Sequence, residues 1–225
     1  MYRVEDKYIC TDNELFLLES RIGTILSPDA YSGGSAYKIT SLYFDDIDNS
    51  HMADSEDGND FRSKYRIRIY NGCTDVIKLE VKYKAYNRVL KKSRTIDTDT
   101  AIAMINGVGV LQDEMSENDP VTLFNLAIKQ DMLRPRVIVE YDRSAYTFEP
   151  GNVRITFDRN VRKSDDIDGF LEGRCTYSML RETNSILEVK YDEFLPGFIA
   201  QLLEGGNMIQ TSYSKYRLCA TQTEG

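Results

Sequence analysis

Lysine and arginine recur in alternate positions in three short runs between residues 62 and 94 of a chain that is otherwise acidic. This segment holds 11 Lys and Arg and two acidic residues, a net charge of +9, whereas the whole chain carries −8. Alternate side chains of a β-strand share a face, so the spacing predicts strands with one cationic and one apolar face. Cations concentrated in this way are typical of a polyanion site. The alternating cations are Lys64, Arg66, Arg68, Lys78, Lys82, Lys92 and Arg94.

A single strand with this pattern is usually an edge strand whose cations lie in water. Several strands that share it favour a common anion site instead. Histidine chemistry is nearly excluded, because the only histidine, His51, lies in an acidic run at residues 45–60 that we expect to be an exposed loop. The glycines of residues 107–110 lack the lysine and the spacing of a phosphate-binding loop.

Length and composition predict one domain over residues 1–225, since 41% of the residues are hydrophobic and no Gly/Ser/Pro linker divides the chain. The first ten residues are not an apolar signal segment, and no stretch approaches the roughly 20 apolar residues of a membrane-spanning helix. The four cysteines lack metal-ligand or redox spacing, which fits a cytoplasmic location. We therefore expect a soluble protein.

Period-two patterns predict eight strands, and capping signals predict the helices between them. The strands are expected at residues 2–9, 37–44, 62–70, 76–84, 88–96, 136–146, 153–158 and 185–191. Thr11 and Glu14 form a predicted capping box, and Asp99 and Asp119 are predicted caps of two later helices, the first ending at Gly107. A final helix is expected at residues 195–203, before Gly205-Gly206.

Strands, then a helical pair, then strands again are typical of an α+β fold rather than of alternating parallel units. Eight antiparallel strands can close into a barrel with a narrow interior. We therefore expect an antiparallel eight-stranded β-barrel tunnel with flanking helices. If the cations line the tunnel, the apolar faces point outward and the amphipathic helices cover them.

Nine short pieces of the chain, in order and spread over about 210 residues, resemble the VTC domain. This is the polyphosphate polymerase domain of the vacuolar transporter chaperone complex, in the triphosphate tunnel metalloenzyme (CYTH-like) superfamily. The pieces are Lys7-Tyr8, residues 40–45, Arg66-Ile67-Arg68, Glu80-Val81-Lys82, Lys92-Ser93-Arg94, Tyr141-Asp142-Arg143, Arg154-Ile155-Thr156, residues 186–190 and Ser214-Lys215-Tyr216.

The resemblance implies a metal-dependent phosphotransferase that moves the γ-phosphate of ATP onto a growing polyphosphate chain, with Mn²⁺ or Mg²⁺ as the cofactor. Glu188 is similar to the metal-binding carboxylate. The implied phosphate-binding, catalytic residues are Lys7, Arg66, Arg68, Lys82, Lys92, Arg143 and Arg154, and the implied substrate-binding residues are Tyr141, Lys190, Ser214 and Lys215.

Two positions depart from the superfamily pattern. Arg3 stands where the Glu-x-Glu-x-Lys start has its first Glu, which favours phosphate holding and resembles the polymerase branch, and Ser212 replaces a lysine of the closing motif. Glu5 and Glu80 are expected to neutralise neighbouring cations rather than to bind the metal.

Two alternatives to the polymerase stay open. They are a tripolyphosphate or nucleoside triphosphate hydrolase, and a non-catalytic domain that binds polyphosphate or inositol polyphosphates. The expected partners are ATP and polyphosphate. Nucleic acid is not expected, since no recognition motif with interleaved aromatics is present. The sequence leaves open a membrane-protein partner and the oligomeric state.

Overall fold

The computed structural model describes residues 3–32, 35–56, 59, 61–86, 88–110, 116–180, 185–204, 208–211 and 214–221. Among these residues the strands form one antiparallel sheet of 11 strands, flanked by helices, so the predicted α+β class is confirmed. The strands are β1 (Val4–Cys10), β2 (Ser27–Pro28), β3 (Tyr37–Asp45), β4 (Phe61–Tyr70), β5 (Cys73–Ala85), β6 (Arg88–Ile96), β7 (Arg134–Phe148), β8 (Val153–Ser164), β9 (Ser178–Met179), β10 (Ser185–Tyr191) and β11 (Ile209–Gln210).

The strand order is β11-β1-β10-β8-β7-β3-β4-β5-β6, with β2 paired to β7 and β9 paired to β8. All eight predicted strands are present, but the predicted number was too low. The three additional strands, β2, β9 and β11, have two residues each and therefore carry no period-two pattern to recognise. In the described residues the path has two ends, β11 and β6, so a closed eight-stranded barrel is not confirmed.

The chain divides into two compact units, each built from three separated segments. Unit 1 comprises Met1–Lys38, Tyr141–Val161 and Met179–Ser214, and unit 2 comprises Ile39–Glu140, Arg162–Ser178 and Lys215–Gly225. Each unit has its own hydrophobic core.

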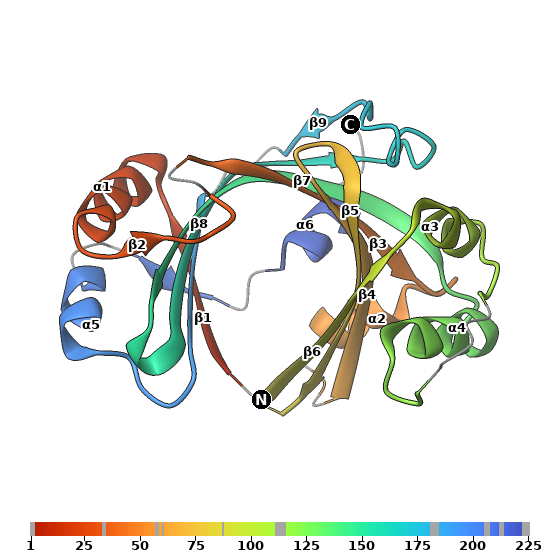
Figure 1. The fold of residues 1–225 in the computed structure, drawn as a ribbon, viewed down its shortest axis with the longest axis horizontal. Helices are drawn as coiled ribbons and strands as arrows, with labels where there is room; N and C mark the ends of the chain where they lie inside the picture. The colour runs from red at the N-terminus through yellow and green to blue at the C-terminus, as the bar shows by residue number, and fades with distance from the viewer. Residues whose placement is uncertain are drawn as a thin grey trace. The chain divides into compact units, whose positions relative to one another are not determined.

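The core of unit 1 lies between strands and the helices α1 (Asp12–Gly23) and α5 (Gly197–Leu203), which contact each other (Figure 1). Leu15, Leu18 and Ile22 of α1 pack on the apolar side chains of β8 and β10. The capping box predicted for Thr11 and Glu14 is confirmed, because both of its reciprocal hydrogen bonds are present.

The core of unit 2 joins the apolar face of β4 and β5 to the helices α3 (Thr98–Ile105) and α4 (Pro120–Gln130), which lie on the same side of these strands (Figure 1). Asp119 caps α4 as predicted, with Pro120 in its first turn. The cap of α3 is Asp97 rather than the predicted Asp99, and the helix therefore begins one residue before Asp99.

The acidic run around His51 is not a loop, contrary to prediction. Residues Ser50–Glu56 form the helix α2, and His51 is partly buried with its ring 5.3 Å from that of Tyr65. The other helical elements of the described residues are η1 (Pro150–Asn152) and α6 (Lys215–Thr221). The predicted stop at Gly205-Gly206 and the departure at Ser212 lie outside the described residues. No helix of the described residues is long and apolar enough to cross a membrane.

Candidate functional site

One face of β4 and β5 in unit 2 carries cations directly opposite one another. Cross-strand partners on this face are Arg62 with Lys84, Lys64 with Lys82, and Arg68 with Lys78, while Arg66 alone stands opposite a carboxylate, Glu80. Like charges at directly opposed positions destabilise a sheet. The other face of the same strands carries the buried Tyr65, Ile67, Leu79 and Val81, so the alternation predicted from the sequence is confirmed. This cationic face of unit 2 extends onto β6 through Lys91, which pairs with Lys82.

The carboxylate of Glu80 lies among the cations of this face. Its Oε2 lies 2.6 Å from Arg66 Nε and 3.7 Å from Arg68 Nη1, and its Oε1 contacts Lys91 Nζ. Burial alone would raise the pKa of Glu80, but these three cations hold it well below its usual range. Partial burial, opposed by the attraction of Glu80, lowers the pKa of Lys91 to about 8. Glu80 therefore acts as the charge-neutralising carboxylate that the sequence predicted.

Neighbouring side chains on β3 fix the two arginines. Arg66 Nη1 donates to the Tyr43 hydroxyl at 2.9 Å, and Arg68 Nε donates to Ser41 Oγ at 3.0 Å. The Tyr43 ring stacks on Tyr216 of α6, with 4.8 Å between centroids. The predicted residue Lys215 is the first residue of α6, so this stacking brings the start of the helix next to the cationic face. Ser214 immediately precedes it and is partly buried.

Lys92 does not lie on the cationic face, which corrects the predicted stripe. The hairpin pairs Ala85 with Arg88, so Lys91 stands opposite Lys82, and Lys92 stands opposite the core residue Val81. Lys92 Nζ instead donates to Asn118 at 2.6 Å. Because the side-chain period of a strand is two, a shift of one residue reverses the face. Arg94 also lies off the cationic face for this reason, and it forms an ion pair with Asp119 at 2.8 Å.

Unit 1 has a second polar face, on β1, β10, β8 and β7. Glu188 of β10 lies at its centre, opposite Lys7 on β1 and opposite Thr156 on β8. Its carboxylate oxygens are 3.3 Å from Lys190 Nζ, 3.7 Å from Arg143 Nη2 and 3.8 Å from Lys7 Nζ. The structure thus brings three predicted site residues, Lys7, Arg143 and Lys190, together around the carboxylate of a fourth, Glu188.

Two arginines of this polar face are held by carboxylates. Arg143 is bidentate to Asp158, with distances of 2.6 and 2.7 Å, and these acidic partners hold its pKa well above the usual value although burial opposes this. The predicted Tyr141 lies under Arg143, with the guanidinium carbon 5.2 Å from the ring centroid. Arg154 donates to Asp29 at 2.6 Å and to the Tyr37 hydroxyl at 3.2 Å.

Glu188 is better suited than Glu80 to hold a divalent metal. Mg²⁺ and Mn²⁺ prefer oxygen ligands and can use one or two carboxylates together with phosphate oxygens. The contacts that Glu188 makes with its three cations are all 3.3 Å or longer, whereas Glu80 accepts a hydrogen bond of 2.6 Å from Arg66. Glu5 lies on the same face, 3.7 Å from Lys190 Nζ, and offers a second carboxylate. The donor set of unit 1 therefore fits the metal that the resemblance implies.

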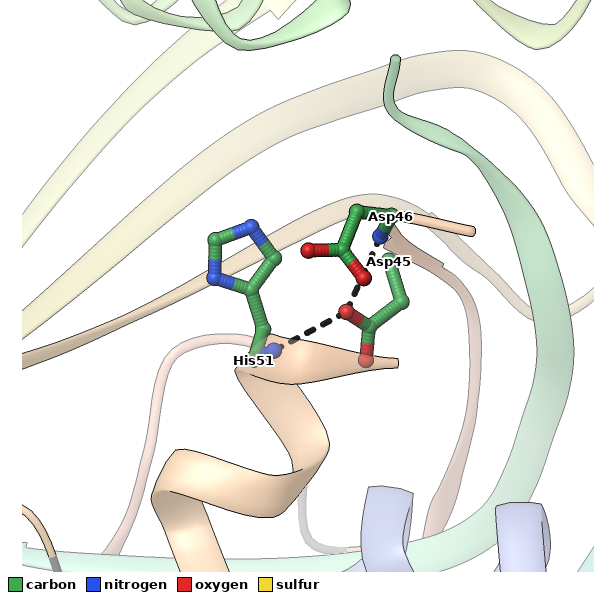
Figure 2. A group of neighbouring side chains, drawn as sticks. All are labelled: Asp45, Asp46 and His51. Atoms are coloured by element: carbon green, nitrogen blue, oxygen red, sulfur yellow. Dashed lines mark hydrogen bonds between the residues drawn. The ribbon is translucent and has the colours of Figure 1, made fainter. Parts of the chain in front are cut away.

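Asp45, Asp46 and His51 also lie close enough to suggest a metal centre, but their contacts are those of a helix cap (Figure 2). Asp45 Oδ1 accepts the backbone N–H of Asp46 and of His51, and Oδ2 accepts the N–H of Met52 and the hydroxyl of Tyr216. Asp45 is fully buried, and all its acceptor positions are used. This cluster starts α2 and is not our candidate metal centre.

A pocket of about 310 Å³ lies beside α2 in unit 2, and its lining includes His51, Ser63 and Tyr83. Ser63 and Tyr83 are one residue out of step with Lys64 and Lys82, so they lie on the opposite face of β4 and β5. The lining also includes Arg62 and Lys84 of the cationic face, so the pocket adjoins the end of that face.

Sequence reasoning missed Lys91, Tyr43, Asp158 and Thr156 at these two faces. The two-residue spacing between Ala85 and Arg88 was a usable signal for Lys91, since a two-residue hairpin turn fixes the register. The other three have no local signal, because their roles depend on residues of neighbouring strands.

Comparison with known proteins identifies the family but not a curated relative. The family model of the VTC domain matches residues 2–223, and no curated protein matches the chain. The structure of HpAC1 from Hippeastrum, assigned as an adenylyl cyclase and described with a dominant triphosphatase activity, is similar with a TM-score of 0.54 at 16% identity, covering 91% of this chain and 85% of that chain. A protein of Bacillus halodurans assigned as an adenylate cyclase is similar with a TM-score of 0.54 at 13% identity, covering 91% and 88%. At these identities the two structures show a shared fold alone. The match over nearly the whole length confirms the resemblance seen in the sequence, and the chain belongs to the VTC domain family.

Proposed function

We propose that this protein is a metal-dependent polyphosphate polymerase that transfers the γ-phosphate of ATP onto a growing polyphosphate chain. The observation that carries the proposal is the set of like-charged pairs on the cationic face of unit 2, where Lys64, Lys82 and Lys91 stand side by side on three strands. Glu80 offsets only part of the repulsion on this face, so the arrangement favours an additional anion between the charges. A linear polyanion with many equivalent oxygens is the ligand that fits it.

Phosphoryl transfer requires the reacting oxygens to be in line and the charge of the equatorial phosphate oxygens to be stabilised. Arg66 and Arg68 are oriented by Glu80, Tyr43 and Ser41, so their planar groups are prepared for bidentate phosphate contacts. The lysines are point charges on flexible stems, which suits a chain that must slide after each addition.

In unit 1 we propose that Lys7, Arg143, Arg154 and Lys190 bind phosphate and that Glu188 holds Mn²⁺ or Mg²⁺. A bound divalent ion would neutralise phosphate charge during transfer. Asp158 fixes the orientation of Arg143 through two hydrogen bonds. We therefore expect Arg143 to keep this orientation when the neighbouring lysines move. Lys82 and Lys91 would bind phosphate in unit 2, and Lys91 replaces Lys92 in the proposed set. Ser214 and Lys215 stay proposed substrate contacts.

The tunnel expected from the sequence, ATP and polyphosphate as partners, and a cytoplasmic location remain part of the proposal. A tunnel predicts that product chains stay bound through many additions, so long chains should appear while most ATP is still unused. A distribution of short chains that lengthen together would contradict a tunnel.

Hydrolysis is the second candidate function, with water as the acceptor in place of polyphosphate. It is favoured by the fold shared with HpAC1, which is described with a dominant triphosphatase activity. A binding module without catalysis is the third.

Product analysis separates the three. The protein is incubated with ATP and Mn²⁺, and the products are resolved by gel electrophoresis and by a free-phosphate assay. We expect long-chain polyphosphate and ADP, and the Glu188→Gln variant, which keeps the size but not the charge of the side chain, should form neither. Free phosphate without polyphosphate would establish the hydrolase, and binding without turnover would refute both enzymatic functions.

A further inference from the structure

Thr156 presents a buried hydroxyl that is not explained by the fold. The residue is 0% exposed, and its Oγ1 has no hydrogen-bond partner among the described residues. A buried hydroxyl without a partner is destabilising, and a valine of the same shape would avoid the problem. The position therefore indicates a ligand that is bound only in a working state of the protein.

The surroundings of Thr156 indicate which ligand this is. Thr156 stands directly opposite Glu188 on the next strand, and Arg154 and Asp158 flank it on the same face. The Asp158 carboxylate accepts two short hydrogen bonds from Arg143, whereas the ion pairs of Glu188 with Lys7 and Lys190 are 3.8 and 3.3 Å long. A hydroxyl beside a carboxylate is an oxygen pair that Mg²⁺ and Mn²⁺ accept, as in sites that combine a Ser or Thr with an acidic residue.

We infer that the Thr156 hydroxyl and Glu188 together bind the divalent metal, and that this pair becomes available only when polyphosphate draws Lys7 and Lys190 away from Glu188. This inference rests on the proposed function and adds to it a ligand and an order of binding.

The order follows from burial. The side chains of Lys7 and Lys190 are 28% and 20% exposed, whereas those of Arg143 and Glu188 are 7% and 8% exposed. Arg143 is fixed by two short hydrogen bonds to Asp158, so the two lysines are the members of the cluster that can move. An arriving polyphosphate offers the two lysines many anionic oxygens. When the lysines move to these oxygens, Glu188 and Thr156 become accessible to the metal. Metal and polyphosphate should therefore bind with positive coupling.

The test compares affinities for tripolyphosphate with and without Mn²⁺ by calorimetry, together with the melting temperature of the ligand-free protein. The wild type should bind Mn²⁺–tripolyphosphate more tightly than metal-free tripolyphosphate, and Mn²⁺ alone should shift its melting temperature little. Thr156→Val should lose about tenfold in affinity for the Mn²⁺ complex only. Thr156→Ser, which keeps the hydroxyl, should stay near the wild type.

Thr40 provides a matched control for stability. It is also buried, 2% exposed, but its hydroxyl donates to Glu140 at 2.8 Å. Thr40→Val should lower the melting temperature by several degrees, whereas Thr156→Val should leave it unchanged or raise it. A drop for Thr156→Val that matches the control, or failure of this variant to fold, would show that the hydroxyl is structural and overturn the inference.

Two further outcomes of the calorimetry also overturn it. One is a Thr156→Val protein that keeps the full preference for the Mn²⁺ complex. The other is tight binding of Mn²⁺ to the ligand-free wild type, which would remove the order of binding. None of these measurements requires turnover, so they decide the inference even if product analysis rejects the polymerase.

Discussion

Replacing Lys82 by Met should stabilise the ligand-free protein and weaken its binding of polyphosphate. Lys82 is partly buried and stands between Lys64 and Lys91 on the neighbouring strands. Two like charges about 6 Å apart repel by about 3 kcal/mol at an effective dielectric of about 20 and by about 0.7 kcal/mol in bulk water. Because Glu80 offsets part of this repulsion, we expect a net gain of about 1 kcal/mol from the loss of the charge, or about 2–4 °C in melting temperature for a chain of this size.

The same substitution should have the opposite effect when tripolyphosphate is present. A ligand at 100 times its dissociation constant stabilises the folded protein by about 2.7 kcal/mol, and a tenfold loss of affinity reduces this to about 1.4 kcal/mol. Thermal melting of Lys82→Met with and without tripolyphosphate, at low ionic strength, measures both effects. The gain without ligand should shrink in about 0.5 M salt, because screening already weakens the repulsion there.

Lys129→Met is the matched control for this experiment. Lys129 is exposed in the last turn of α4, where a cation favours the helix, so its loss should leave stability unchanged or slightly lower it. Our reasoning is refuted if Lys82→Met melts at a lower temperature than the wild type at low salt, or if its gain does not depend on salt. Either result would mean that the three lysines do not repel one another in the empty protein.

Three further predictions concern individual side chains. Glu188→Gln should abolish turnover, because it removes the proposed metal ligand. Its affinity for metal-free tripolyphosphate, measured by calorimetry, should stay within about threefold of the wild type, because all the proposed phosphate-binding cations remain. Because the folded-state pKa of Lys91 is about 8, below its usual 10.5, tripolyphosphate affinity should fall as the pH rises from 7 to 9. Over pH 8 to 10.5 the unfolded chain binds more protons at Lys91 than the folded protein does, so the contribution of Lys91 to the free energy of unfolding should rise with pH. Lys91→Arg should remove the pH dependence of both affinity and stability. A wild-type affinity that does not change between pH 7 and 9 would contradict this. Asp158→Asn should lower the free energy of unfolding by about 3 kcal/mol or more, because it leaves the buried charge of Arg143 without its bidentate partner; denaturant melting measures the loss, and wild-type stability would exclude this role.

The long strands could be predicted from the sequence because their alternation is local. Arg88–Ile96 and Ser185–Tyr191 have the bounds that the period-two pattern indicates. Helix α2 could not be predicted in this way. Its start depends on Asp45, whose carboxylate reaches the N–H groups of His51 and Met52 six and seven residues later, and the run itself has no apolar helical period.

In the candidate site, too, the sequence predicts local alternation but not which residues of neighbouring strands lie together. Counting alternate residues within one strand placed Lys92 in the cationic stripe, but the face is set by the pairing of Ala85 with Arg88 across the turn. Thr156 could be assigned to a strand from the sequence. Its burial and its lack of a hydrogen-bond partner among the described residues depend on tertiary packing, and only the structure shows them.

The two central carboxylates illustrate why residue type and spacing do not determine a role. Glu80 and Glu188 lie in identical five-residue stretches, Leu-Glu-Val-Lys-Tyr at residues 79–83 and 187–191. Adjacent strands give them different neighbours. Arg66 and Lys91 engage Glu80 closely, so it can only neutralise and orient cations. The ion pairs of Glu188 with Lys7 and Lys190 are longer, and Thr156 stands opposite Glu188 on β8, so we expect Glu188 to exchange partners when phosphate arrives. We therefore expect the same short sequence to orient arginines in unit 2 and, under the proposed function, to provide a metal ligand in unit 1.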